Sequence, residues 1–375
     1  MATAPQLQPL PPGIANLADF EAPAKARMTA QAWAYLSGGA ADEITLRANR
    51  AAWDGLLLQP RVLRELAGGH TRSQLLGREL SLPVLLAPIA YQRLAHADGE
   101  LAVAYAAAAQ GIGMVLSAQA SVGLDAVAQA MASEVQAGPL WFQLYWRPDP
   151  GFMRELLQRV EAAGYEALVL TVDAPVHGAR DRERRAGFEL PPDVRAVNLG
   201  GLKQALHLAP GQSAMFDGLM PGAATWAQVE WLRAQSRLPL LLKGVSHPAD
   251  ALEARQHGVA GLIVSNHGGR TLDTLPSTVA MLPRIRAAVG AEFPLLVDGG
   301  IRRGTDVLKA LALGADAVLL GRPYVHALAA AGALGVAHAL RLLRDEFEIA
   351  MALCGCKTVA EIDAHCLWQE HPKVG

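Results

Sequence analysis

Eight short stretches of the chain are continuously apolar and rich in Val, Leu and Ile. They are Leu82–Ala90, Gly113–Gln119, Leu140–Trp146, Ala167–Pro175, Pro239–Ser246, Gly261–Gly268, Pro294–Ile301 and Ala317–Pro323. Their apolar residues follow one another without the alternation that marks a strand with one face in water. Continuous runs of this kind indicate strands that are buried on both faces, as in a parallel sheet.

Segments with the spacing of amphipathic helices lie between most of these strands. Apolar residues recur three and four positions apart in Gly99–Gln110, Leu124–Ala132, Gly151–Ala163, Pro248–Gln256, Pro276–Val289 and Arg303–Leu313. A strand followed by a helix, repeated in this way, is the pattern of an α/β protein with a (β/α)8 barrel, also called a TIM barrel. A doubly wound open sheet is the alternative, although most such sheets carry fewer similar units.

Helical spacing also marks the two ends of the chain, outside the predicted barrel. Residues 1–80 are expected to cover the outside or bottom of the barrel, with helix-like stretches at Leu17–Met28, Ala30–Leu36 and Asp42–Trp53. Residues 331–375 contain two more such stretches, at Val336–Cys354 and Thr358–Cys366. Neither end resembles a separate domain, so we expect residues 1–375 to form a single domain with its barrel at 81–330.

One interval between strands is much longer than the others. It runs from Val176 to Arg237, is rich in Gly and Pro, and contains a possible short amphipathic helix at Leu202–Leu208. Connections of this length inside a compact domain are usually functional or disordered. We interpret this one as a lid over the mouth of the barrel; a surface loop without a gating role is the alternative.

The composition is that of a chain with a large core and little net charge. Of the 375 residues, 51% are hydrophobic and 18% are charged, and the formal net charge is −2. A balance this close to neutral gives no reason to expect nucleic acid or a membrane surface as a partner. A charged substrate is therefore expected to be bound by a few local cations.

Three cysteines, Cys354, Cys356 and Cys366, lie near the C-terminus. An odd and clustered set is not a disulfide framework, and Cys-Gly-Cys is not the usual spacing of a zinc pair. The N-terminal segment lacks a basic region and an apolar run of signal-peptide length, and no stretch approaches the ~18 apolar residues of a membrane span. We therefore expect reduced thiols, no metal and a cytoplasmic protein.

The predicted strands end in polar or otherwise unusual residues. The carboxyl ends of barrel strands open on one face of the barrel, where active sites lie. Side chains that are scattered along the sequence are therefore expected to meet there. The set comprises Ser117, Gln143, Tyr145, Thr171, Asp173, Lys243, Ser265, Asn266, His267, Asp298, Gly299, Gly300, Gly321 and Arg322.

The most informative string is Ser265-Asn266-His267-Gly268-Gly269-Arg270, at the end of the sixth predicted strand. An imidazole gains or loses a proton near neutral pH, and a guanidinium binds a carboxylate through two parallel hydrogen bonds. The pair suits a substrate whose carboxylate adjoins a carbon or oxygen that loses a proton. A structural role for His267 is the alternative, and the neighbouring Arg270 favours the catalytic one.

Four further residues near this mouth are candidates for the same site. Asp173 could orient His267 and stabilise its protonated form, and Arg180 could be a second carboxylate ligand. Tyr145 offers a hydroxyl, and Lys243 could form a Schiff base or stabilise negative charge on an electron-accepting ring. The structural alternatives are a loop cap for Asp173, a solvated cluster for Arg180 and a core position for Tyr145.

The last two predicted strands end in glycines followed by arginines. Backbone N–H groups of glycine-rich turns can approach a phosphate closely, and barrels often bind phosphate after their seventh and eighth strands. Because the carboxylate ligands are placed elsewhere, a phosphorylated cofactor is favoured over a phosphorylated substrate. The segments concerned are Asp298-Gly299-Gly300-Ile301-Arg302 and Gly321-Arg322-Pro323.

These motifs together resemble the FMN-dependent α-hydroxy acid oxidases and dehydrogenases, the family of glycolate oxidase, lactate oxidase and mandelate dehydrogenase. The resemblance extends from about Ala34 to Cys356. Its most specific strings are SNHGGR and DGGIRRGTDV, supported by YLSGGAADEITLRAN, LLAPIAYQRLAHADGE, WFQLYW, LTVDAP, LLKGV and RDEFEIAMALCGC.

The resemblance implies a role for each matching residue. His267 corresponds to the catalytic base with Asp173 as its partner, Arg270 and Arg180 to the carboxylate ligands, and Tyr145 to a substrate contact. Lys243 corresponds to the residue beside the N1–O2 edge of the flavin. The other implied flavin contacts are Pro88, Ile89, Ala90, Ser117, Gln143, Thr171 and Ser265, and the implied phosphate contacts are Asp298, Gly299, Gly300, Ile301, Arg302, Gly321 and Arg322.

The sequence departs from the family pattern at three positions, and a fourth distinguishes members of the family. Ala34 aligns with a tyrosine that contacts the substrate carboxylate, and the tyrosine here is the next residue, Tyr35. Gln119 replaces the tryptophan of glycolate oxidase and His177 replaces a common leucine, which indicates a substrate that is larger or more polar than glycolate. Ala90 stands where mandelate dehydrogenase has glycine, which favours an oxidase.

The implied reaction is the oxidation of an L-2-hydroxy acid to a 2-keto acid with FMN as cofactor and O2 as final acceptor, yielding H2O2. A quinone or carrier protein is the rival acceptor. Two further hypotheses stay open: a different FMN barrel enzyme, such as a type 2 isopentenyl diphosphate isomerase, and an FMN-binding barrel with impaired catalysis. The resemblance also implies a homotetramer, the usual assembly of this family.

Overall fold

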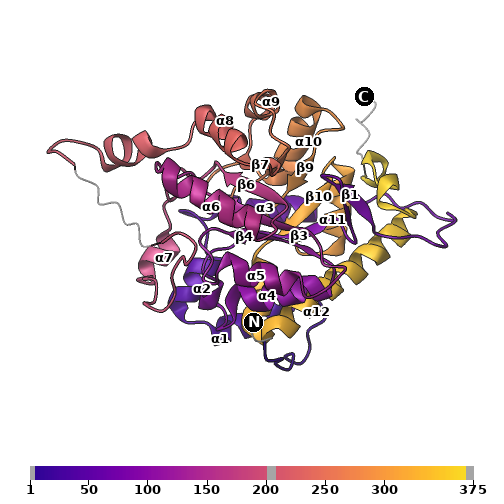
Figure 1. Ribbon diagram of the computed structural model, residues 1–375. Coiled ribbons are helices and arrows are strands. Elements are labelled where there is room, and N and C mark those ends of the chain that lie inside the picture. The colour runs from indigo at the N-terminus through magenta and orange to yellow at the C-terminus, as the bar shows by residue number, and fades with distance from the viewer. Residues whose placement is uncertain (1–4, 201–207, 369–375) are drawn as a thin grey trace.

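The computed structural model describes residues 5–200 and 208–368, and its centre is a closed barrel of eight parallel strands (Figure 1). Around the barrel the order is β10-β3-β4-β5-β6-β7-β8-β9, so each strand adjoins its neighbours in the sequence and the last pairs with the first. The strands are β3 (Val84–Leu86), β4 (Gly113–Ser117), β5 (Leu140–Leu144), β6 (Ala167–Thr171), β7 (Leu240–Val245), β8 (Gly261–Val264), β9 (Leu295–Val297) and β10 (Ala317–Leu320). This confirms the predicted (β/α)8 fold, and every strand lies within its predicted stretch.

Helices surround the barrel on its outside and connect successive strands (Figure 1). Their apolar faces pack on the strands, which explains why both faces of each strand are buried and why the sequence shows unbroken apolar runs. The helices are α4 (Gly99–Ala109), α5 (Leu124–Met131), α6 (Pro150–Ala162), α8 (Trp226–Gln235), α9 (Pro248–Gln256), α10 (Thr278–Val289), α11 (Gly304–Ala312) and α12 (Arg322–Cys354).

The core has an inner and an outer part. Inside the barrel, side chains such as Leu85, Val115, Trp141 and Leu241 fill the space between the strands. Outside it, a larger cluster joins the other strand faces to the surrounding helices. This filled interior leaves the polar residues at the strand ends as the place for a site.

Part of the N-terminal segment does not lie where the sequence predicted it. Its helices are η1 (Leu17–Phe20), α1 (Glu21–Arg27), α2 (Ala30–Ser37) and α3 (Ile44–Gly55). The side chains of Asn49 and Asn266 exchange two hydrogen bonds of 2.8 Å, and Arg50 donates to the carbonyl oxygen of Gly300. The expectation that these stretches cover the outside or bottom of the barrel is therefore wrong for α3, which reaches the carboxyl ends of the strands.

A short hairpin contacts the barrel interior instead. It consists of β1 (Ser73–Leu75) and β2 (Arg78–Leu80), which pair antiparallel. Leu75 and Leu80 join the apolar cluster inside the barrel together with Ala317, the first residue of β10. The hairpin thus covers the amino ends of the strands, opposite to the site.

The long connection after β6 contains short helical turns in its described part. These are α7 (Asp181–Arg185), a π-helical turn at Ala214–Leu219 and a 3-10 turn at Met220–Gly222. The possible helix at Leu202–Leu208 falls, except for its last residue, outside the described residues.

The C-terminal helix α12 is long and apolar enough to span a membrane by length and composition alone. However, 72% of its most apolar window is buried inside the structure, as expected for the core helix of a folded domain. The tail beyond it forms two 3-10 turns, Val359–Glu361 and Ala364–Cys366.

Candidate active site

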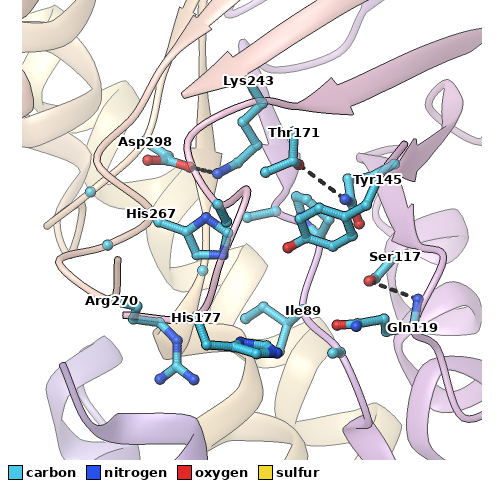
Figure 2. A pocket seen from close by; sticks show the side chains of 18 of the residues that line it. Ile89, Ser117, Gln119, Tyr145, Thr171, His177, Lys243, His267, Arg270 and Asp298 are labelled. Carbon is cyan, nitrogen blue, oxygen red and sulfur yellow. Dashed lines mark hydrogen bonds and ion pairs between the residues drawn. The ribbon is translucent and has the colours of Figure 1, made fainter. Parts of the chain in front are cut away.

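A cavity of about 500 Å³ opens at the carboxyl ends of the barrel strands (Figure 2). Every residue that the sequence placed in the site lines this cavity, with the exceptions of Asp173, Ser265 and Asn266. Asp173 and Ser265 lie directly behind lining residues and hydrogen bond to them, Asp173 to His267 and Ser265 to Lys243. The fold therefore brings together side chains that are far apart in the sequence.

The backbone at His267 adopts an unusual conformation. His267 lies in the loop after β8 and has a φ of 56°, and Gly268 and Gly269 continue with φ values of 61° and 72°. A left-handed conformation is unfavourable for a non-glycine residue and is found mostly where the surroundings enforce it, often at functional sites. Here the hydroxyl of Ser265 accepts a 3.0 Å hydrogen bond from the backbone N–H of His267 and helps to fix the turn.

His267 and Asp173 form a hydrogen-bonded pair. The Nδ1 atom of His267 lies 2.9 Å from Oδ1 of Asp173, and the two side chains are 20% and 10% exposed. Burial lowers the pKa of His267 below its usual value, although Asp173 acts in the opposite direction. His267 is therefore neutral at pH 7 and can accept a proton at Nε2, while Asp173 stabilises the imidazolium that results.

Two guanidinium groups lie beside His267 at the cavity wall. Arg270 donates from Nη1 to the backbone oxygens of Tyr35 and Gly38, at 2.6 and 2.8 Å. Arg180 contributes a buried Nε that has no hydrogen-bond partner in the described part of the chain. Both arginines line the cavity, so both can bind the carboxylate of a ligand.

Tyr35 lies in the cavity wall, and Ala34 does not. The guanidinium carbon of Arg270 is 5.2 Å from the centre of the Tyr35 ring, and the ring stacks on Phe188 with a centroid separation of 4.6 Å. Ala34 is buried in the same helix. The alanine at position 34 therefore does not deprive the wall of a tyrosine, because the next residue supplies one beside the arginine.

Lys243 is held in its charged form by two neighbours. Its Nζ lies 3.0 Å from Asp298 Oδ2 (Figure 2). It also lies 2.9 Å from the hydroxyl of Ser265. Burial acts to lower the pKa of Lys243, but the carboxylates of Asp298 and Asp173 outweigh it and the pKa is raised. A permanent positive charge at this place suits the stabilisation of negative charge on a neighbouring ring.

Asp298 is better suited to a hydroxyl than to a phosphate. Its carboxylate pairs with Lys243, and its Oδ1 is buried without a partner among the described residues. An anionic oxygen repels phosphate but accepts a hydrogen bond from an alcohol. The interpretation of Asp298 as a phosphate ligand is therefore not supported by its surroundings, in contrast to the arginines that follow.

Arg302 and Arg322 form a cationic pocket at the far end of the cavity. Burial, followed by repulsion from Arg270 and Arg302, lowers the pKa of Arg322 to about 9, and burial also lowers that of Arg302. The Nε of Arg322 is buried and has no hydrogen-bond partner within the described ranges. Two desolvated cations with a free donor require an anion, and a phosphate meets that requirement.

The surroundings of Gly300 show why the turn beside Arg302 and Arg322 requires glycine. Its φ is 85°, and a Cβ atom would lie 2.7 Å from the backbone oxygen of Asn49. Any side chain would therefore collide with α3 and strain the backbone. The turn can come close to a ligand only because this residue is glycine.

A row of polar side chains runs along four neighbouring strands. Ser117 on β4 pairs in register with Gln143 on β5, and Thr171 on β6 pairs with Lys243 on β7. Gln143 Nε2 also donates to the hydroxyl of Thr171 at 3.0 Å (Figure 2). Such a row can hydrogen bond to the polar edge of a flat heteroaromatic ring, so the cavity offers complementary ends for a flavin ring and a phosphate.

Three polar groups face the remaining space of the cavity. They are the amide of Gln119, the imidazole of His177 and the hydroxyl of Tyr145, and Figure 2 shows Gln119 and His177 on either side of Ile89. Burial and the charge of Arg180 lower the pKa of His177, and burial raises that of Tyr145 to about 12. At neutral pH all three are uncharged hydrogen-bonding groups.

Several lining residues were not predicted from the sequence. Leu46, Asn49 and Arg50 come from α3, and Leu199, Leu219, Gly222, Ala223 and Ala224 come from the long connection after β6. Leu46 and Asn49 belong to the string YLSGGAADEITLRAN, which marks the resemblance but assigns them no contact, and only the folded arrangement places these residues in the wall. The part of the connection at 219–224 supports its interpretation as a cover over the mouth.

Residues 24–369 match the model of the FMN-dependent dehydrogenase family. The chain belongs to this family. The match spans nearly the whole chain and includes the cavity residues described above. It confirms the resemblance that the sequence motifs indicated, and it confirms FMN as the cofactor.

Individual relatives cover almost the entire chain. An L-lactate oxidase of Alicycliphilus denitrificans is 49% identical over 94% of this chain and 96% of its own length. Glycolate oxidase 1 of Zea mays is 42% identical over 96% of this chain and 97% of its own length. A crystal structure of mandelate oxidase with (S)-2-phenylpropionate superimposes with a TM-score of 0.84 at 43% identity, covering 95% of this chain and 98% of that one.

Proposed function

We propose that this enzyme oxidises an L-2-hydroxy acid to the 2-keto acid and passes the electrons to O2, yielding H2O2. The observation that carries the proposal is the joint placement of His267 and the two arginines, Arg180 and Arg270, on one cavity wall. A neutral base beside a carboxylate-binding pair fits a substrate that carries its reactive carbon next to a carboxylate. The names of the relatives, oxidases of lactate, glycolate and mandelate, support this reaction class.

Each residue of the site has its own role in this reaction. Arg180 and Arg270 hold the substrate carboxylate, and the hydroxyl of Tyr145 is a neutral donor in the same wall. His267 takes a proton from the substrate, either from its hydroxyl group or from its α-carbon, and Asp173 stabilises the protonated ring. FMN, when bound, accepts the two electrons that the substrate loses.

The two ends of the cavity would hold the cofactor. Arg302, Arg322 and the glycine turn at 299–300 would bind its phosphate, and the row from Ser117 to Lys243 would contact the ring. Asp298 is available to a hydroxyl of the linking chain through its unpartnered Oδ1. Lys243 places its positive charge at the end of the row.

Oxygen is favoured as the final acceptor over a quinone or a carrier protein. Ala90, which lines the cavity, supports this choice, because mandelate dehydrogenase has glycine at the corresponding place. The wall contains the full set of base, arginines and tyrosine, which argues against an FMN-binding barrel without activity.

The substrate side chain is expected to be polar or larger than that of glycolate. Gln119 and His177 line the cavity, and in the described part of the chain neither side chain has a hydrogen-bond partner of its own. Gln119 is partly buried and His177 is exposed. A ligand that covers both groups and hydrogen bonds to them therefore binds better than one that covers them and leaves them unpaired.

We further propose that the enzyme is a cytoplasmic homotetramer. The tetramer is proposed only because it is the usual assembly of this family. The location is supported by three free cysteines, Cys354, Cys356 and Cys366, which are buried as thiols. Light scattering of the purified holoenzyme tests the assembly, with a tetramer expected and a monomer contradicting it.

A substrate panel under exclusion of oxygen tests the proposed reaction. The FMN-loaded enzyme is mixed with glycolate, L-lactate, glycerate and (S)-mandelate, and the visible flavin absorbance is followed. We expect bleaching by at least one L-2-hydroxy acid and recovery of the colour with H2O2 formation when oxygen is admitted. No bleaching by any of them would contradict the proposal, and bleaching without reoxidation by oxygen would favour another acceptor.

A further inference from the structure

A carboxylate that belongs to the protein lies between the two arginines of the site. Glu183 on α7 places Oε1 3.3 Å from Nη1 of Arg180 and 3.2 Å from Nη2 of Arg270. Its side chain is 13% exposed, and those of the arginines are 13% and 15% exposed. The three groups therefore form a buried cluster in which one negative charge bridges two positive ones.

Glu183 stands behind the arginines and not in the cavity. Arg180 and Arg270 line the cavity, whereas Glu183 is absent from the described lining residues. The Nε of Arg180 is buried and has no hydrogen-bond partner in the described structure. The bridge thus engages one Nη atom of each arginine without placing its carboxylate in the cavity wall.

The net charge of this cluster determines which anion it matches. Two guanidinium groups and one carboxylate leave one net positive charge, which a single bound carboxylate neutralises. Without Glu183 the cluster would carry two positive charges and would match a ligand with two negative charges. In a partly buried site such a difference is weakly screened and has a large effect on anion binding.

We propose that Glu183 is a specificity-determining residue that sets this site for 2-hydroxy monocarboxylates and against dianionic ligands. The inference rests on the proposed function, because it takes the arginines as the carboxylate ligands. Glu183 touches neither the substrate nor the cofactor and acts through Arg180 and Arg270. Its bridge also holds two like charges side by side when no ligand is bound.

The helix that carries Glu183 has other anchors. Arg182 pairs with Glu43 of the N-terminal segment, and Gln31 donates to the backbone oxygen of Gly187 just beyond the helix. Loss of the Glu183 charge therefore leaves α7 attached. This separates the electrostatic role of Glu183 from a merely structural one.

Two anions of nearly equal shape provide the test. Oxalate carries two negative charges, and oxamate has an amide in place of one carboxylate and carries one. Their dissociation constants are measured on the oxidised FMN-loaded enzyme from the change in flavin absorbance, without turnover. The quantity of interest is the preference for oxalate over oxamate, because a loss of shape or stability affects both ligands alike.

Glu183→Gln is expected to raise the ratio of oxalate affinity to oxamate affinity by about tenfold or more. Removal of the negative charge of Glu183 strengthens the attraction for every negative charge on a ligand, and oxalate carries one more than oxamate. Glu183→Asp restores the charge and is expected to keep the preference near that of the wild type, even if both ligands bind more weakly. Asp181→Asn is the matched control. It removes the same charge from the same helix, but Asp181 pairs with the outward arginines Arg184 and Arg185.

The outcomes separate the two proposals. A preference that is unchanged in Glu183→Gln, or that changes equally in Asp181→Asn, overturns the role of Glu183. If neither anion perturbs the flavin of the wild-type enzyme, the carboxylate site itself is misplaced, and the proposed function fails with it. A raised preference in Glu183→Gln alone supports the inference.

Discussion

Arg270 contacts Tyr35 in two ways: its Nη1 donates to the Tyr35 backbone oxygen at 2.6 Å, and its guanidinium carbon lies 5.2 Å from the centre of the ring. The backbone contact fixes the position of the arginine, and the aromatic face stabilises its charge. The tyrosine hydroxyl remains available to a ligand, since burial raises its pKa to about 12 and keeps it protonated.

Substitution of Tyr35 separates these contributions. Tyr35→Phe keeps the ring and the backbone contact, and we expect KM for the hydroxy acid to rise by about tenfold, the value of one lost hydrogen bond. Tyr35→Ala also removes the cation–π contact, and a further rise is expected. Steady-state kinetics with the best substrate of the panel measures both. Equal KM values in all three proteins would exclude Tyr35 from substrate binding.

The pH dependence of the reaction should report the His267–Asp173 pair. Because burial lowers the pKa of His267 below 6.5, the base is lost only when the pH falls through that lower value. We expect kcat/KM to rise with pH through an ionisation below 6.5 and to be level at neutral pH.

Removal of the Asp173 charge should move this ionisation. Asp173 raises the pKa of His267, so Asp173→Asn should shift the ionisation to lower pH. The rate should also fall by about a hundredfold or more, because the imidazolium loses its partner. A pH–rate profile of both proteins measures the shift. An ionisation that moves to higher pH would contradict the assignment of this pair.

Lys243→Met should slow substrate oxidation more than it weakens substrate binding. The charge of Lys243 acts on the ring side of the cavity, so we expect the rate of anaerobic flavin bleaching to fall by about a hundredfold with a small change in the apparent Kd of the substrate. Asp298 would also lose its partner, and a buried unpaired carboxylate costs about 3–5 kcal/mol of stability. Thermal unfolding of the variant checks this cost. A large change in substrate Kd with an unchanged rate would argue against the role of Lys243.

Arg322 should determine how firmly the cofactor is held. It is buried, its pKa is lowered to about 9, and its Nε lacks a partner among the described residues. We expect Arg322→Gln to weaken FMN binding by about 1.5–3 kcal/mol, the range for a hydrogen bond to a charged group. Arg303→Gln is a matched control, because Arg303 pairs with Glu346 outside the cavity. Fluorescence titration of the apoprotein with FMN measures both, and equal affinities would contradict the phosphate site.

The sequence was sufficient for the barrel and for the meeting of most candidate side chains in one cavity. Strands buried on both faces leave an unmistakable apolar run, and their carboxyl ends meet at one mouth, so His267 and Lys243 could be placed together although they come from different strands. The position of α3 could not be predicted, because helical periodicity shows that a helix has a buried face but not what covers it.

The role of Glu183 shows a second limit. The residue lies in the run Asp181-Arg182-Glu183-Arg184-Arg185, which has the pattern of a solvated helix surface. Its partner Arg270 is 87 positions away, and only the fold shows that they meet. Tyr35 illustrates a related limit, since a motif gives the position of a residue along the chain but not the direction in which its side chain points.

The most direct test of the mechanism is anaerobic reduction of the FMN-loaded enzyme by its best L-2-hydroxy acid, comparing the wild type with His267→Ala. We expect the flavin of the wild type to bleach and that of the variant to stay yellow over the same time. The rate of flavin reduction should be lower in the variant by about 10²–10⁴-fold, the usual contribution of a general base. Bleaching at equal rates in the two proteins, or a wild-type protein that takes up no FMN, would contradict it.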